Sequence, residues 1–217
     1  MAVALGTACF GCLAMIAVRA ERTGQLGYGL LVWNLFLAAM AFPLGWLVDA
    51  LARRRHPIGA LVAGGAWLLF FPNAPYLITD LIHLRRSAEV PFLFDAILFG
   101  AFAMTGMLLG FVSLYLVHVS VSRAYGTAWG WLVAMGSIGL GSYGIYLGRV
   151  ERWNSWNIVT SPGALARSVS DHVSNPFSNV QAVVLTGAFA LFLATGYLVI
   201  WAFIHVVRVD SRPMTPR

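Results

Sequence analysis

Residues 70–84 read FFPNAPYLITDLIHL, a hydrophobic segment that is interrupted by two prolines and carries four polar side chains at intervals of three or four residues. These side chains are those of Asn73, Tyr76, Asp80 and His83. At about 100° per residue, helical geometry predicts that all four lie within an arc of roughly 80°. Ionisable groups near the hydrocarbon of a membrane are costly and usually have a function. This polar stripe therefore predicts both a broken helix and the location of a site.

The composition of the whole chain is that of an integral membrane protein. Of the 217 residues, 59% are hydrophobic and only 10% are charged, whereas soluble globular domains average roughly 25% charged residues. The formal net charge of +6 suits anionic lipid headgroups. Because the arginines are scattered between apolar segments, we expect membrane lipids as partners and no nucleic acid.

Six apolar segments have about the 20 residues that a helix needs to cross the hydrocarbon core. They lie near residues 2–18, 29–48, 58–79, 92–119, 128–148 and 182–207. The sequence therefore predicts an all-α, polytopic transmembrane helix bundle of about six spans. It forms a single integral membrane domain, 1–217, with one longer extramembrane loop, 149–181. We expect the first segment to be a span rather than a cleaved signal peptide, because no basic residue precedes it.

The third span is broken by Pro72 and Pro75, which each remove a backbone donor and clash with the preceding turn. Two alternatives remain. Either the span is kinked, or Pro75 begins a separate amphipathic helix at the membrane interface, with its leucines and isoleucines on the apolar side. In both cases the freed carbonyl groups must face protein or a water-filled cavity, because lipid cannot satisfy them.

The arginines of the loops indicate the orientation. Each face of the predicted bundle carries seven arginines, and setting aside Arg149 and Arg152 of the motif described next leaves seven against five. This count favours both termini in the cytoplasm. The polar stripe and the loop 149–181 then share the outer face.

A second polar motif follows the fifth predicted span and reads SYGIYLGRVERWNSWN over residues 142–157. Tyr146 and Arg149 are three residues apart and so share one helical face. Arg149 would lie about one turn outside the hydrocarbon, where a guanidinium can make two parallel hydrogen bonds to a carboxylate or a phosphate. Asp80 is a candidate partner on the same side. The tryptophans of the motif also fit an aromatic belt at headgroup level.

The two motifs, in this order, resemble a bacterial family of multi-pass membrane proteins that is catalogued as a domain of unknown function, numbered thirteen sixty-one. The resemblance spans most of the chain. It rests on FPNAPY at 71–76 with Asp80 and His83, and on YGIYLGR at 143–149 with Arg152, Asn154, Ser155 and Trp156. The family's second motif has an acidic residue where this chain has Asn157. The resemblance implies a bacterial inner (plasma) membrane protein and points to the same two motifs, but it implies no activity.

Together the motifs form a composite candidate site. Asp80 and His83 would act as general acid and base. The expected ligand-binding side chains are those of Asn73, Tyr76, Tyr146, Arg149, Arg152, Asn154, Ser155 and Trp156. We expect no cofactor and no metal, because Asp80 and His83 supply two ligands where a catalytic zinc site takes three from the protein. A separation of Asp80 from Arg149 by more than about 10 Å, one Debye length, would exclude the composite site.

Asp95 is a further acidic residue close to a predicted span end. It follows Pro91 by four residues, so it either caps the fourth span or sits in its first turn, where the helix dipole favours negative charge, or it pairs with Arg149, Arg152 or His83. We favour the cap.

Three functions are compatible with the composite site. The leading one is a polar pocket at one membrane face that binds an anionic lipid or a lipid-linked, phosphate-bearing ligand, and whether it also catalyses a reaction stays open. An oligomeric transporter or channel component would use the broken third span beside a polar pathway. A non-catalytic scaffold would use the polar residues to lock helices together and bind a partner subunit. Small residues four apart, such as Gly106 and Gly110, promote close helix contact, either within the chain or in a homo-oligomer.

Overall fold

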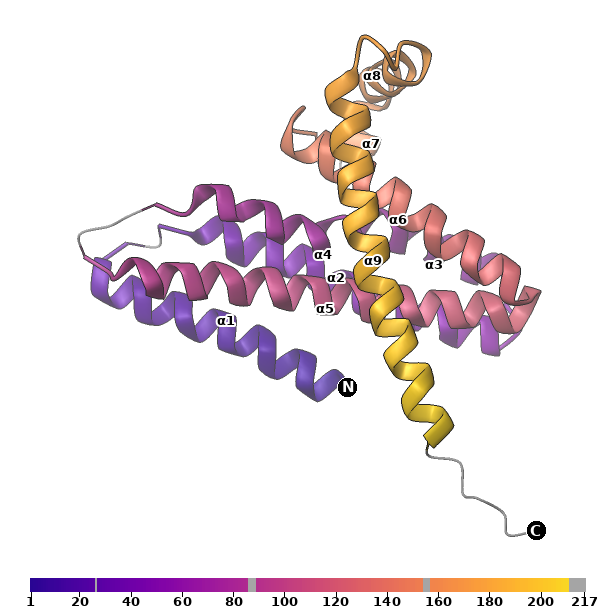
Figure 1. Ribbon diagram of the computed structural model, residues 1–217, viewed down its shortest axis with the longest axis horizontal. Coiled ribbons are helices and arrows are strands. Elements are labelled where there is room, and N and C mark those ends of the chain that lie inside the picture. Colours follow the sequence, from indigo (N-terminus) through magenta and orange to yellow (C-terminus); the bar gives the residue numbers. More distant parts are fainter. Residues whose placement is uncertain (26, 86–88, 154–156, 211–217) are drawn as a thin grey trace.

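The protein is helical and has no strand in the part that its computed structural model describes, residues 1–25, 27–85, 89–153 and 157–210. The chain forms α1 (Ala2–Thr23), α2 (Gly29–Arg53), α3 (Pro57–Phe70), α4 (Asn73–Tyr76), the 3-10 helix η1 (Leu77–His83), α5 (Phe92–Tyr125), α6 (Thr127–Arg149), α7 (Asn157–Thr160), α8 (Pro162–Ser174) and α9 (Val180–Asp210) (Figure 1). The prediction of an all-α membrane bundle is confirmed.

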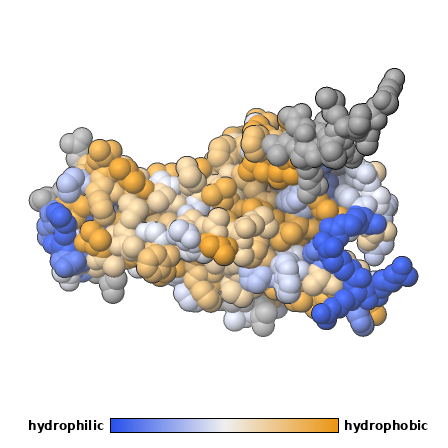
Figure 2. Space-filling view, turned by 90° about the horizontal axis from the view of Figure 1, so that it is seen from below, coloured by the Kyte–Doolittle hydropathy of each residue, from blue (hydrophilic) through white to orange (hydrophobic). Residues whose placement is uncertain are grey.

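Five helical runs are long and apolar enough to cross a membrane: Ala2–Thr23, Gly29–Arg53, Pro57–His83, Phe92–Tyr125 and Val180–Val206. They correspond to the first four predicted spans and the sixth. The fifth predicted span forms the continuous helix α6, but its glycines, serines and tyrosines make it less apolar than the other five, so its membrane crossing stays a prediction. Figure 2 shows one face of the molecule, with hydrophobic residues over its middle and hydrophilic residues at its two ends.

The helix α5 is the centre of the bundle. The helices α1, α2, α4, η1 and α6 all pack against it, and α9 crosses in front of it and packs mainly on α6 (Figure 1). Phe102 and Leu114 of α5 are completely buried in two separate hydrophobic clusters. Between helices in lipid, such contacts stabilise through close van der Waals packing.

Close approach of α4 to α5 depends on Gly106. A Cβ atom at this position would lie 2.4 Å from the backbone oxygen of Ala74 and 2.7 Å from a methyl carbon of Leu77. One turn further, a Cβ at Gly110 would lie 3.1 Å from the Cβ of Ala74. This pair of small residues is therefore used for packing within the chain.

The third span is kinked rather than divided into two separate helices. Although α3 ends at Phe70, Phe71 and Pro72 keep right-handed helical dihedrals, with φ of −52° and −61°. The helices α4 and η1 therefore continue the span (Figure 1). Beyond the break the hydrogen bonding tightens, since the Ala74 amide donates to the Phe71 carbonyl at 3.1 Å. Of the two alternatives, the kinked span is the one observed.

The 3-10 helix η1 turns its acidic side chain into the protein. Asp80 is 3% exposed, whereas Ile82 is 68% exposed. An interfacial helix would leave its polar side in water, but η1 packs against both α2 and α5. The reason for this orientation is the set of polar partners that Asp80 finds on the neighbouring helices.

Replacing Gly106 by Ala should destabilise the protein by about 1–3 kcal/mol, because the added methyl group meets backbone atoms that cannot move aside without shifting α4. Thermal unfolding in detergent micelles measures the change. Gly100→Ala on the same helix is the matched control, since a Cβ there has nothing within 4 Å. Equal stability of the two variants would contradict the close contact at Gly106.

Candidate functional site

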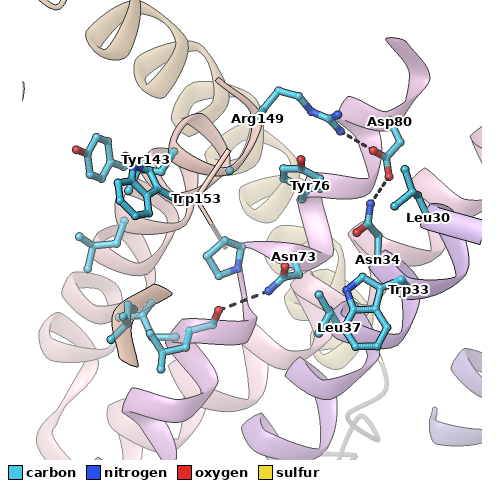
Figure 3. A pocket seen from close by; sticks show the side chains of 18 of the residues that line it. Leu30, Trp33, Asn34, Leu37, Asn73, Tyr76, Asp80, Tyr143, Arg149 and Trp153 are labelled. Atoms are coloured by element: carbon cyan, nitrogen blue, oxygen red, sulfur yellow. Dashed lines mark hydrogen bonds and ion pairs between the residues drawn. The ribbon is translucent and has the colours of Figure 1, made fainter. Parts of the chain in front are cut away.

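A cavity of about 480 Å³ lies between α2, the kinked third span, α6 and the segment α7–α8 (Figure 3). We call it the Arg149 cavity. Its polar lining consists mainly of Asn34, Asn73, Tyr76, Asp80, His83 and Arg149. Its hydrophobic lining includes Leu30, Trp33, Leu37, Leu68, Leu69, Leu140, Leu147, Ile158 and Leu165.

Arg149, at the end of α6, connects the polar side chains. Its Nε donates to Thr79 Oγ1 at 2.9 Å, and its Nη1 to His83 Nε2 at 3.0 Å. Its Nη2 donates to Thr79 Oγ1 and to Asp80 Oδ1. The guanidinium carbon also lies 4.4 Å from the centre of the Tyr76 ring, within the range of a cation–π interaction. The polar stripe and the second motif are therefore in direct contact.

Asp80 has partners at both carboxylate oxygens. Oδ1 accepts from Arg149, and Oδ2 accepts from Asn34 Nδ2 at 2.8 Å (Figure 3). The Asp80 side chain is 5% exposed and that of Arg149 20% exposed. A buried charge is costly unless it is paired and hydrogen-bonded, and this carboxylate is both. The helices α2, η1 and α6 thus meet at Asp80, while its role as a catalytic acid or base stays a prediction.

His83 accepts a hydrogen bond from Arg149. A guanidinium carries only donors, so the 3.0 Å contact requires an unprotonated Nε2. The neutral ring then carries its proton on Nδ1. The His83 side chain is exposed.

Asn73 supplies a hydrogen-bond donor at the proline break. Its Nδ2 donates to the Phe70 carbonyl at 3.1 Å. In an uninterrupted α-helix this carbonyl would accept from the Ala74 amide, which instead bonds to Phe71. The freed carbonyl therefore faces protein, as expected of a broken span in lipid.

A second polar network fastens α8 to the end of α6. Glu151 Oε1 lies 2.8 Å from His172 Nε2, and His172 Nδ1 lies 2.8 Å from the Tyr143 hydroxyl. Glu151 Oε2 accepts from Trp153 Nε1 at 2.9 Å and from the Ser168 hydroxyl. Because an ionised carboxylate only accepts, Nε2 carries a proton. In the neutral ring Nδ1 is then the acceptor, and Tyr143 donates to it. This network holds α8 in place as one wall of the cavity.

The remaining predicted site residues lie away from the cavity or outside the described part. Tyr146 is buried, stacks on Tyr143 and contacts the His172 ring. Arg152 is exposed, has a φ of 62° and does not line the Arg149 cavity. Three predicted ligand-binding residues lie outside the described residues: Asn154, Ser155 and Trp156.

Asp95 is the partner of Arg19 of α1, and no side-chain cap is formed at the start of α5. Arg19 Nε lies 2.8 Å from Asp95 Oδ1 and Nη2 lies 3.3 Å from Oδ2. The Tyr28 hydroxyl donates to Oδ2 at 3.4 Å, and its ring centre lies 4.0 Å from the Arg19 guanidinium carbon. Burial, together with the nearby Asp95 charge, raises the pKa of Tyr28. The side-chain cap is therefore not formed, whereas the expected position in the first turn of the span is observed. The ion-pair partner is Arg19 and not Arg149, Arg152 or His83.

Several side chains of the site are absent from the sequence prediction. Asn34 could have been predicted, because a lone amide within an apolar span needs a hydrogen-bond partner. Thr79 adjoins Asp80, but no spacing rule selects it. Glu151 and His172 are 21 positions apart, and only the fold brings them together.

Comparison with known proteins identifies a family. A family model described as "Protein of unknown function (DUF1361)" matches residues 33–202. The matched range contains both polar motifs and all the side chains that line the Arg149 cavity except Leu30. No curated protein and no solved structure matches the chain.

Replacing Asp80 by Asn should destabilise the protein by about 3 kcal/mol, because the partly buried Arg149 guanidinium loses its counter-charge. The loss of unfolding free energy in the double variant Asp80→Asn/Arg149→Gln should be smaller than the summed losses of the two single variants, by at least about 1 kcal/mol. Equilibrium unfolding in detergent micelles measures all three. The exposed Glu21→Gln is the control, with an expected change within about 0.5 kcal/mol. Additive losses would contradict the ion pair.

Proposed function

The chain belongs to this family of unknown function, so its role must be argued from the site, and we propose that the Arg149 cavity binds an anionic membrane lipid or a lipid-linked, phosphate-bearing compound. The observation that carries the proposal is the Arg149 guanidinium lining a cavity whose remaining walls are largely hydrophobic. A guanidinium is the side chain best suited to bind phosphate through directed hydrogen bonds.

The lining of the cavity favours an amphiphile over a small polar solute. Binding sites usually combine hydrophobic walls with a few convergent polar groups that fix the orientation of the ligand. Here the polar groups are contributed by the third span, α2 and the end of α6, whereas leucines of α2, α3 and α6 line much of the remaining wall. A ligand with an anionic head and an apolar body matches both parts.

The charge balance of the cluster favours binding through directed donors rather than through a strong positive field. Asp80 neutralises Arg149, and His83 is neutral in the contact described above. Of the five N–H bonds of a guanidinium, the contacts within the described residues take four, which leaves one Nη1 hydrogen for a ligand. The Tyr76 hydroxyl and the His83 Nδ1–H provide further donors nearby.

A second candidate function is the non-catalytic one. The contacts of Asp80 with Arg149 and Asn34 join three helices, and this supports a role in locking the bundle. Locking and binding are compatible, and the ligand experiment below separates them. We also infer, from the arginine count of the loops, that the cavity opens to the outer face of a plasma membrane with both termini in the cytoplasm.

Binding of phosphatidylglycerol should weaken by about tenfold or more in the double variant Asp80→Asn/Arg149→Gln, which removes the phosphate-binding donor without leaving an unpaired buried charge. Native mass spectrometry of the protein in detergent, with phosphatidylcholine as the competitor, measures the affinity. Arg152→Gln is the matched control, because it removes an exposed arginine outside the cavity. Equal binding by wild type and the double variant would leave only the locking role.

A further inference from the structure

An apolar groove of about 490 Å³ runs along one side of α8. It is lined by Ile158 of α7 and by Pro162, Leu165, Ala166, Val169 and Val173 of α8, with two serines at its edge. Val173 is 74% exposed and Ile158 42% exposed. We call this the α8 groove. Charged side chains do not contribute to its lining in the described part of the chain, which suits a hydrocarbon occupant.

The α8 groove adjoins the Arg149 cavity. Ile158 and Leu165 line both spaces, so the two are separated by no more than these side chains. The cavity provides the polar groups around Arg149, and the groove extends its hydrophobic wall along α8. A helix of 13 residues is about 20 Å long, enough to accompany a substantial part of an acyl chain.

From these two shared lining residues we propose that the α8 groove receives an acyl chain of the lipid whose headgroup lies in the Arg149 cavity. The inference rests on the proposed function and deepens it. It specifies the ligand as a lipid with a long hydrocarbon chain, in contrast to a free phosphate or a short phosphate ester.

The amphipathic pattern of α8 supports a lipid occupant. Leu165, Val169 and Val173 recur every four residues and so form one apolar side, while Arg167 and Asp171 are exposed. In the chain α8 lies between α7 and α9, and Figure 1 shows it beside the start of α9. An amphipathic helix beside the ends of membrane spans rests with its apolar side in the lipid interface, where an acyl chain is available.

The polar network of Glu151 keeps the groove aligned with the cavity. His172 and Ser168 of α8 both bond to Glu151, and His172 also bonds to Tyr143 of α6. These contacts lie on the side of α8 that faces the protein, so they leave the apolar side free. Leu165, which lines both the groove and the cavity, is thereby held beside the wall of the cavity that α6 forms.

Photocrosslinking tests the proposal directly. The full chain is reconstituted in nanodiscs with phosphatidylglycerol that carries a diazirine near the end of one acyl chain, and labelled peptides are identified by mass spectrometry. Saturable labelling should fall on the segment 158–173. Leu165→Trp should reduce this labelling by roughly tenfold, because a larger side chain overfills the junction. Gly163→Trp is the matched control, since a Cβ at this exposed position of α8 has nothing within 4 Å.

The outcomes distinguish this inference from the proposed function. If headgroup binding, measured by competition with short-chain phosphatidylglycerol, is intact but the label falls only on spans outside 158–173, the groove proposal is overturned and the headgroup site stands. If saturable labelling is unchanged in the double variant Asp80→Asn/Arg149→Gln, the proposed headgroup site itself is refuted. Conversion of a dimer to a monomer by Leu165→Trp in size-exclusion chromatography would show that a second copy occupies the groove, and would also overturn the proposal.

Discussion

The burial of one ion pair, between Arg149 and Asp80, is the constraint on which the rest of the site depends. A charged pair in surroundings with little water is stable only if its remaining hydrogen-bonding groups are also satisfied. Asn34 on α2 and Thr79 on η1 provide this, and the guanidinium itself comes from α6. The pair therefore fixes three helices relative to one another. The Arg149 cavity is the space between those helices. The ion pair therefore determines both the shape of the cavity and the position of its polar groups.

The two prolines determine how the third span reaches this pair. They interrupt the α-helical hydrogen bonds, and from Leu77 the chain continues as a 3-10 helix. In a 3-10 helix, residues three apart lie directly above one another, whereas an α-helix would set Asp80 and His83 about 60° apart. A single guanidinium can consequently contact both side chains. Asn73 reduces the cost of the break by donating to the Phe70 carbonyl.

Sequence reasoning reached the membrane bundle, the break at the two prolines and the pairing of the two motifs, because these follow from composition, from proline stereochemistry and from the cost of isolated charges in lipid. It left open whether the broken span is kinked or divided. Its limits are equally physical. Helical periodicity assumed one turn angle throughout, so the exact alignment of Asp80 with His83 was not foreseen. The partner of Asp95 was not predicted, because Arg19 counted only among the arginines of the loops. His172 was not predicted either, because contacts between a loop helix and a span end have no fixed spacing.

The chain builds the same polar unit twice, and the comparison explains why only one is a candidate binding site. Arg19 pairs with Asp95 and lies over Tyr28, and Arg149 pairs with Asp80 and lies over Tyr76. In the first unit Asp95 is 1% exposed and its arginine side chain 10% exposed. It binds α1 to α5 with a bidentate, closed geometry. In the second unit the arginine shares its donors among several partners, is 20% exposed and lines a cavity. A donor left over from pairing can serve a ligand only where the ligand can reach it, and of the two arginines it is Arg149 that lines the cavity. The difference between a helix lock and a binding site here is therefore the access of the arginine to a cavity, not the residue types.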